Sequence, residues 1–194
     1  MSKKRIALVD LDGCYVLRDK SFFDRVIEKL AGLFIEEARV EGITLFFQIL
    51  RDNKNIYEVN EEIDSFLRSQ EFDEEFILTA RRRKDLDSLR IEKLTDLCEK
   101  FDSIIFYPGR TIEGENLLEM ESSKLKYFLG MDYVDYKIRV AEEFSKDKEV
   151  FIVDNSEKII EAATTQEYIK KQFLVNGRKI FEVDKEGNKR HLEV

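Results

Sequence analysis

Asp10 and Asp12 stand one residue apart, at the end of a short apolar run that begins at residue 5. In an extended backbone both side chains point to the same side, so their carboxylates lie close together. Two carboxylates held this close repel each other unless a cation lies between them. Mg²⁺, a hard ion that prefers oxygen ligands, is the natural partner of such a pair. A bound Mg²⁺ neutralises phosphate charge while a carboxylate attacks phosphorus, so the pair indicates phosphoryl-transfer chemistry.

Further polar groups stand where three other apolar runs end: Thr79, the turn at Pro108, and Asp154 with Asn155. Runs of this kind are typical of buried parallel strands, and the carboxyl ends of parallel strands are where ligands bind. We therefore expect these groups and the Asp10–Asp12 pair to form one polar site.

The elements that must position this site alternate between strand and helix. Apolar runs predict strands at 5–10, 75–79, 103–107 and 149–154, and helical spacing predicts helices at about 85–100, 136–144 and about 157–171. This alternation implies a mostly parallel sheet with helices on both faces. In the tail, Asn176-Gly177 separates two short apolar runs, 173–175 and 180–183, which predicts a β-hairpin. Residues 109–134 show no strong period and receive no element.

Residues 17–72 interrupt this alternation with mostly helical patterns. An amphipathic helix is expected from Ser21 onward, followed by a compact apolar segment over 43–50. Residues 55–60 are expected to form a loop, with Asn60 capping a further helix. We interpret 17–72 as a helical insertion into the sheet domain.

Composition excludes several functional classes. The 194 residues include 33 Lys and Arg against 41 Asp and Glu, and the net charge of −8 argues against broad wrapping of nucleic acid. Cys14 and Cys98 have no C-x-x-C spacing, which argues against a disulfide framework and a zinc knuckle. No apolar stretch approaches the length of a membrane span. We expect a soluble, cytoplasmic protein that does not contact membranes.

The stretch Ile6-Ala7-Leu8-Val9-Asp10-Leu11-Asp12-Gly13 resembles the first motif of the haloacid dehalogenase-like (HAD) superfamily of phosphohydrolases. The resemblance implies that Asp10 is the nucleophile, which forms an aspartyl-phosphate, and that Asp12 is the general acid and base. The family's usual Thr after the glycine is Cys14 here.

Three later motifs follow in the family's order. Phe76-Ile77-Leu78-Thr79 resembles the second motif, which implies phosphate binding by Thr79 and Ala80. Lys137 is the candidate for the third, a lysine at a helix start, with Lys124, Lys126 and Lys146 as alternatives. Val153-Asp154-Asn155-Ser156 is similar to an Asp-Asn form of the fourth, which implies that Asp10, Asp12, Asp154 and Asn155 hold the metal. Many members carry a further acid where this chain has Lys158 and Ile159.

Taken with the resemblance, the sequence predicts an α/β protein: a Rossmann-like, mostly parallel sheet with a helical C1-type cap and a C-terminal β-hairpin. Residues 1–16 and 73–194 would form the catalytic core and 17–72 the cap. The expected function is Mg²⁺-dependent hydrolysis of a phosphomonoester, a small phosphorylated metabolite or nucleotide.

Two alternatives stay open. The run Arg81-Arg82-Arg83-Lys84 favours a phosphatase of nucleic-acid ends, because arginines grip phosphates. The missing distal acid favours a non-catalytic protein that keeps the fold to bind a partner.

Overall fold

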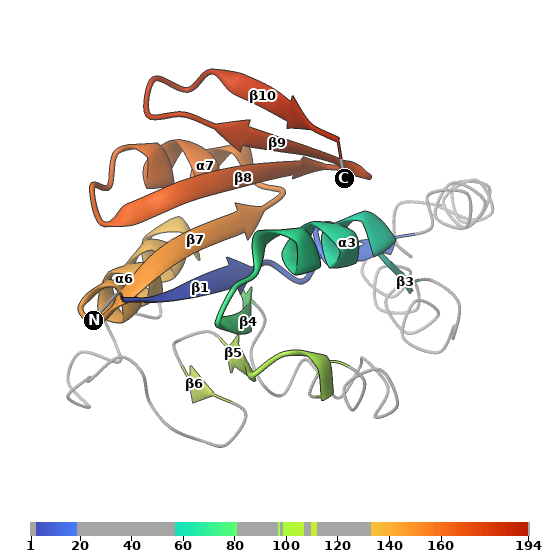
Figure 1. Cartoon of the computed structure of the whole chain (residues 1–194), viewed down its shortest axis with the longest axis horizontal. Helices are drawn as coiled ribbons and strands as arrows, with labels where there is room; N and C mark the ends of the chain where they lie inside the picture. The colour runs from blue at the N-terminus through green and yellow to red at the C-terminus, as the bar shows by residue number, and fades with distance from the viewer. Residues whose placement is uncertain are drawn as a thin grey trace, which may run out of the picture.

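The apolar runs of the sequence form the central strands of an eight-stranded mixed sheet in the computed structural model (Figure 1). The structure describes residues 3–18, 57–80, 97, 99–106, 110–111 and 133–193. The elements of this part of the chain are β1 (Lys4–Val9), β2 (Val16–Arg18), β3 (Tyr57–Val59), α3 (Glu61–Gln70), β4 (Glu74–Thr79), β5 (Ser103–Phe106), β6 (Arg110–Thr111), α6 (Tyr133–Ser145), β7 (Lys148–Asp154), α7 (Glu157–Thr164), β8 (Ile169–Asn176), β9 (Lys179–Val183) and β10 (Lys189–Leu192).

The sheet has the strand order β10-β9-β8-β7-β1-β4-β5-β6. Its five middle strands, from β8 to β5, pair in parallel, and the strands beyond them pair antiparallel. β1 lies between β7 and β4, with Leu8 beside Ile152 on one side and Phe76 on the other. This arrangement confirms the predicted α/β class with a mostly parallel sheet.

Two apolar cores cover the two faces of the sheet. Ile6 and Leu8 of β1 pack with buried residues of α6 and α7, whereas Ala7 and Val9 pack with those of α3. This division follows from the alternation of side chains along a strand. Figure 1 shows α3 on the face opposite α6 and α7. The helices thus hold the strand ends in place from both sides.

The stretch assigned to an insertion is described only at its two ends. Residues 17–18 belong to β2, which pairs antiparallel with β3, so the prediction of a loop over 55–60 is wrong for residues 57–59. These strands are three residues long and have no apolar run to signal them. The helix predicted after Asn60 is confirmed as α3, and its Ile63, Phe66 and Leu67 pack on the sheet. The predicted helix from Ser21 and the segment 43–50 lie outside the described residues.

The C-terminal hairpin is confirmed, with two corrections around it. β8 and β9 pair antiparallel across a turn at Gly177, whose φ of 60° suits a glycine. The helix predicted over 157–171 ends at Thr164, and β8 begins at Ile169. β10, which carries Lys189, Arg190 and His191, adds a third strand that the sequence pattern did not indicate.

Several other predictions fall partly or wholly outside the described residues. Of the helix predicted over 85–100, only residues 97, 99 and 100 are described, and they are helical. Residues 110–111 form β6 and 133–134 begin α6, at the two ends of the segment that received no element. The run Arg81 to Lys84, Cys98 and the turn at Pro108 lie outside. Among the helices of the described part, none is long and apolar enough to cross a membrane.

Candidate active site

Three of the predicted site residues lie at the carboxyl ends of adjacent parallel strands. Asp10 follows β1, Thr79 ends β4 and Asp154 ends β7. The backbone N–H of Asp10 donates to the carbonyl of Val153 at 2.8 Å and thereby continues the pairing of β1 with β7. All three side chains are buried, Asp10 at 8%, Asp154 at 2% and Thr79 at 1% exposure. The sheet topology alone therefore gathers them at one edge.

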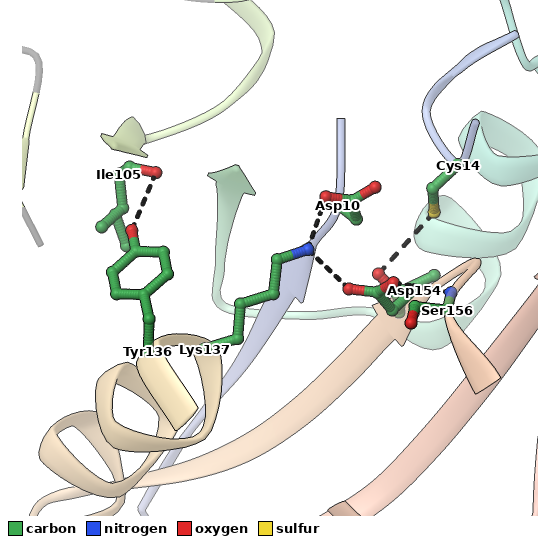
Figure 2. Close-up of polar contacts among 8 residues, drawn as sticks. Asp10, Cys14, Ile105, Tyr136, Lys137, Asp154 and Ser156 are labelled. Atoms are coloured by element: carbon green, nitrogen blue, oxygen red, sulfur yellow. Dashed lines mark hydrogen bonds and ion pairs between the residues drawn. The ribbon is translucent and has the colours of Figure 1, made fainter. Parts of the chain in front are cut away.

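Lys137 of α6 joins two of these carboxylates. Its Nζ lies 2.5 Å from Oδ1 of Asp10 and 2.6 Å from Oδ2 of Asp154. Figure 2 shows the side chain rising from the start of α6 and ending between the two aspartates. At 3% exposure the ammonium is almost completely withdrawn from water. Buried charges of this kind are stable only when they are paired, and Lys137 is paired twice.

Packing of α6 fixes where Lys137 points. Tyr136 is fully buried, and its hydroxyl donates to the carbonyl of Ile105 in β5 at 3.5 Å (Figure 2). The hydroxyl of Tyr168 donates to the carbonyl of Ile138 at 3.4 Å. These contacts anchor the two residues that flank Lys137 in α6.

The electrostatics of the site follow from burial and charge. Burial raises the pKa of Asp10 to about 7; the nearby carboxylates of Asp154 and Asp12 add to this, while Lys137 opposes it. Burial alone would lower the pKa of Lys137, but the carboxylates of Asp154 and Asp10 outweigh it and raise that pKa. Lys137 therefore carries its charge at neutral pH. Three carboxyl groups, Asp10, Asp12 and Asp154, surround this one ammonium, and such a surplus of acidic groups favours a further cation.

The chain after Asp10 forms a tight turn that carries Asp12. The N–H of Tyr15 donates to the carbonyl of Asp10 at 3.2 Å, and the N–H of Val16 donates to that of Leu11 at 2.8 Å. Gly13 has a φ of 78°, which side chains other than hydrogen rarely permit. Asp12 itself is half-buried.

Oxygen atoms converge where this turn meets the end of β7. The side-chain amide of Asn155 lies 3.3 Å from Oδ2 of Asp10 and 3.3 Å from the backbone carbonyl oxygen of Asp12. With its nitrogen toward them, the amide donates to both oxygens. With its oxygen toward them, it adds a third oxygen beside these two, the type of ligand that a hard divalent cation prefers. The donor set therefore fits Mg²⁺.

The remaining predicted residues have simpler surroundings. Ala80 is exposed directly after Thr79. Lys146, an alternative to Lys137, lies just past the far end of α6, where it pairs with Glu143 and is 67% exposed. Lys124 and Lys126 lie outside the described residues. At the positions of the family's distal acid, Lys158 is exposed and Ile159 is packed in the core, so neither adds a ligand.

Among the described residues, no group of three or more Asp, Glu, His or Cys side chains gathers closely enough to bind a metal. Any cation at this site would therefore depend on the carbonyl of Asp12 and the amide of Asn155 as well as on carboxylates. Sequence reasoning did not anticipate two supports of the site. One is the N–H of Ser156, which donates to Oδ1 of Asp154 at 2.8 Å, and the other is Asn60. An Asn before a helix gives no sequence signal beyond that of a cap.

Fold and site together define an α/β protein with a buried lysine between two aspartates at the carboxyl edge of its parallel strands. No protein-family model, curated protein sequence or solved structure matches this chain.

Proposed function

We propose that this protein is a Mg²⁺-dependent phosphomonoester hydrolase of the HAD type. The observation that carries the proposal is the position of Lys137. Its Nζ bridges Asp10 and Asp154 at the carboxyl ends of the central strands β1 and β7. Asp10 lies 127 positions before Lys137 and Lys137 lies 17 before Asp154, and each residue belongs to a different sequence motif. The strand order supports the finer classification as a Rossmann-like sheet, into which residues 17–72 would be inserted as the cap.

In the proposed reaction Asp10 acts as the nucleophile. One of its carboxylate oxygens bonds to phosphorus as the bond from phosphorus to the leaving oxygen breaks, which gives an aspartyl-phosphate. Asp12 donates its proton to the leaving oxygen. It then removes a proton from a water molecule, whose oxygen attacks phosphorus and releases phosphate from Asp10.

The other side chains hold the phosphoryl group. The ammonium of Lys137 and the hydroxyl of Thr79 bind its oxygens and offset the charge that spreads over them. The carboxylates of Asp10 and Asp154, the carbonyl of Asp12 and the amide of Asn155 would hold Mg²⁺. The bound ion supplies positive charge for the phosphate in the ground and transition states.

The proposed substrate is a small phosphorylated metabolite or nucleotide. The acidic balance of the chain disfavours long-range attraction of a polyanion, whereas a buried lysine suits one phosphate group. The phosphatase of nucleic-acid ends remains the alternative, based on the run Arg81 to Lys84.

A phosphate-release screen with and without Mg²⁺ tests the proposal. Nucleotides, sugar phosphates and oligonucleotides phosphorylated at the 3′ or 5′ end are compared for the wild type, Asp10→Asn and Asp147→Asn. We expect Mg²⁺-dependent release that Asp10→Asn abolishes, because an amide cannot act as the nucleophile. Asp147 is exposed and lies beyond α6, so its variant controls for the loss of one carboxylate. Turnover by Asp10→Asn close to that of the wild type would exclude the covalent mechanism, and release by no protein on any substrate would favour the non-catalytic alternative.

A further inference from the structure

Asn60 is a fully buried amide at the N-terminal end of α3, 0% exposed. It occupies the N-cap position, with extended backbone angles of φ −81° and ψ 94°, but its side chain makes no capping hydrogen bond to α3. Within the part of the chain that is described, its Oδ1 has no hydrogen-bond partner. A residue placed only to begin the helix would use that oxygen as the cap. The amide therefore serves another contact.

The amide nitrogen of Asn60 joins two segments far apart in the sequence. Nδ2 donates to the carbonyl of Cys14 at 3.0 Å and to the carbonyl of Gly177 at 3.1 Å. The backbone N–H of Asn60 donates to the carbonyl of Tyr15 at 2.9 Å. One residue thus holds two successive carbonyls of the turn after β1 and fixes them to the β8–β9 turn.

The carbonyls that Asn60 holds belong to the turn that carries Asp12. In the same turn Gly13 lies against the side chain of Asn155, and the carbonyl of Asp12 faces the Asn155 amide. A shift of the Cys14 carbonyl therefore moves the Asp12 carbonyl relative to Asn155 and Asp10. Misplacement of reacting groups by about 1 Å can cost roughly a hundredfold in rate.

We propose that Asn60 is a positioning residue, which holds the Asp12 turn in register with Asp10 and Asn155 through its bonds to the Cys14 and Gly177 carbonyls. The effect on catalysis rests on the proposed function, whereas the restraint on the turn does not.

Gln172 provides a matched control. It is also a buried amide, 2% exposed, with Nε2 hydrogen-bonded to the carbonyl of Val183 and with Oε1 lacking a partner among the described residues. It lies within β8, five residues before the turn at Gly177, and its bond joins β8 to β9. Gln172→Met therefore removes a comparable buried amide without touching the Asp12 turn.

Reactivity of Cys14 measures the restraint without any enzyme assay. Its thiol is buried in the turn, so a thiol reagent labels it only when the turn opens. In a Cys98→Ser background, we expect Asn60→Leu to raise the labelling rate by about tenfold or more, because two carbonyls lose their donor. Urea titration gives the free energy of global unfolding of each variant. The rise in labelling rate should exceed the rise that the change in this free energy predicts. Gln172→Met should show no such excess, and equal behaviour of the two variants would overturn the proposal.

Turnover of p-nitrophenyl phosphate tests the catalytic consequence. We expect Asn60→Leu to lower kcat by about tenfold and to raise the Mg²⁺ concentration for half-maximal rate, while Gln172→Met keeps both. A kcat and Mg²⁺ midpoint unchanged in Asn60→Leu would overturn the positioning role. If the wild type releases no phosphate but the labelling differs, the restraint stands and the proposed function fails.

Asn60→Asp is the second variant, should Asn60→Leu not fold. The introduced side chain would repel both carbonyls when it is ionised, whereas its protonated form can donate to one of them. The ratio of the activity of Asn60→Asp to that of the wild type, measured at the same pH, should therefore rise as pH falls. A ratio that is constant with pH would contradict the role of the donated bonds.

Discussion

Gly13 faces the side-chain amide of Asn155 so closely that a β-carbon on residue 13 would lie 2.5 Å from it. Its φ of 78° already disfavours any other residue. We expect Gly13→Ala to destabilise the fold by about 1–2 kcal/mol through backbone strain and to displace Asn155. The displacement should raise the Mg²⁺ concentration required for half-maximal phosphate release.

Gly187→Ala is the control that separates backbone strain from the displacement of Asn155. Gly187 has a φ of 86°, but a β-carbon there meets nothing within 4 Å. It should lose comparable stability in urea unfolding and keep the wild-type Mg²⁺ midpoint. A shifted midpoint in both variants, or in neither, would contradict a specific contact between Gly13 and Asn155.

Lys137→Met removes the cation between Asp10 and Asp154. Two buried carboxylates are then left facing each other, so we expect a loss of about 3–5 kcal/mol and no turnover. Addition of Mg²⁺ should recover part of the lost stability, because the ion replaces the missing charge. Urea titrations with and without Mg²⁺ measure both effects.

Lys146→Met is the control for a lost lysine charge. Lys146 pairs with Glu143 on the surface, and such pairs contribute less than about 1 kcal/mol. Equal losses in the two lysine variants would mean that the ammonium of Lys137 is not essential to the buried cluster.

Asp154→Ala should weaken Mg²⁺ binding more than Asn155→Ala does, because a carboxylate supplies charge and an amide does not. Phosphate release is measured against Mg²⁺ concentration for each variant. Coinciding midpoints would show that the metal ligands at the end of β7 are wrongly assigned.

Glu74 contributes stability that depends on pH. Hydrogen bonds from Lys148 and Lys4, each at 2.5 Å, lower the pKa of this carboxyl. Because the folded state favours the ionised form, the contribution is present above the unfolded pKa, about 4.3, and is lost as pH falls through the lower folded pKa. Glu74→Gln should therefore cost about 1 kcal/mol at pH 7 and little at pH 2.

Thermal unfolding of Glu74→Gln between pH 2 and 7 measures this contribution. Glu157→Gln is the control, since Glu157 pairs with Lys189 on the open surface. We expect little change in that variant at any pH. A deficit in Glu74→Gln that is the same at both pH limits would refute the electrostatic origin.

Most of the central sheet could be predicted because its strands are buried on both faces. β1, β4, β5 and β7 have continuous apolar runs, and Asp10, Thr79 and Asp154 stand at their ends. The outer elements carry no such signal. β10 consists of Lys189, Arg190 and His191 before one leucine, and its strand conformation comes from pairing with β9.

The errors around α7 and Asn60 have a similar origin. Residues after Thr164 suit a helix by composition, but β8 is held by pairing with β7 and β9. The role of Asn60 depends on Gly177, which is 117 positions away. Local sequence patterns carry no information about such contacts, so the placement of Asp10, Thr79 and Asp154 at strand ends could be predicted but the residues that support them could not.

The placement of β1 between β4 and β7 has a consequence for the order of events during synthesis. Lys4 pairs with Lys148, so one edge of β1 has no native neighbour until the ribosome has released β7, 144 positions further along the chain. Contacts this distant in sequence are typical of slow folding. Until then the backbone N–H and C=O groups along that edge of β1 are unpaired and open to other strands. Asp10 is thus synthesised long before Lys137 and Asp154, so the buried cluster that joins these three side chains forms only after β7 has been made.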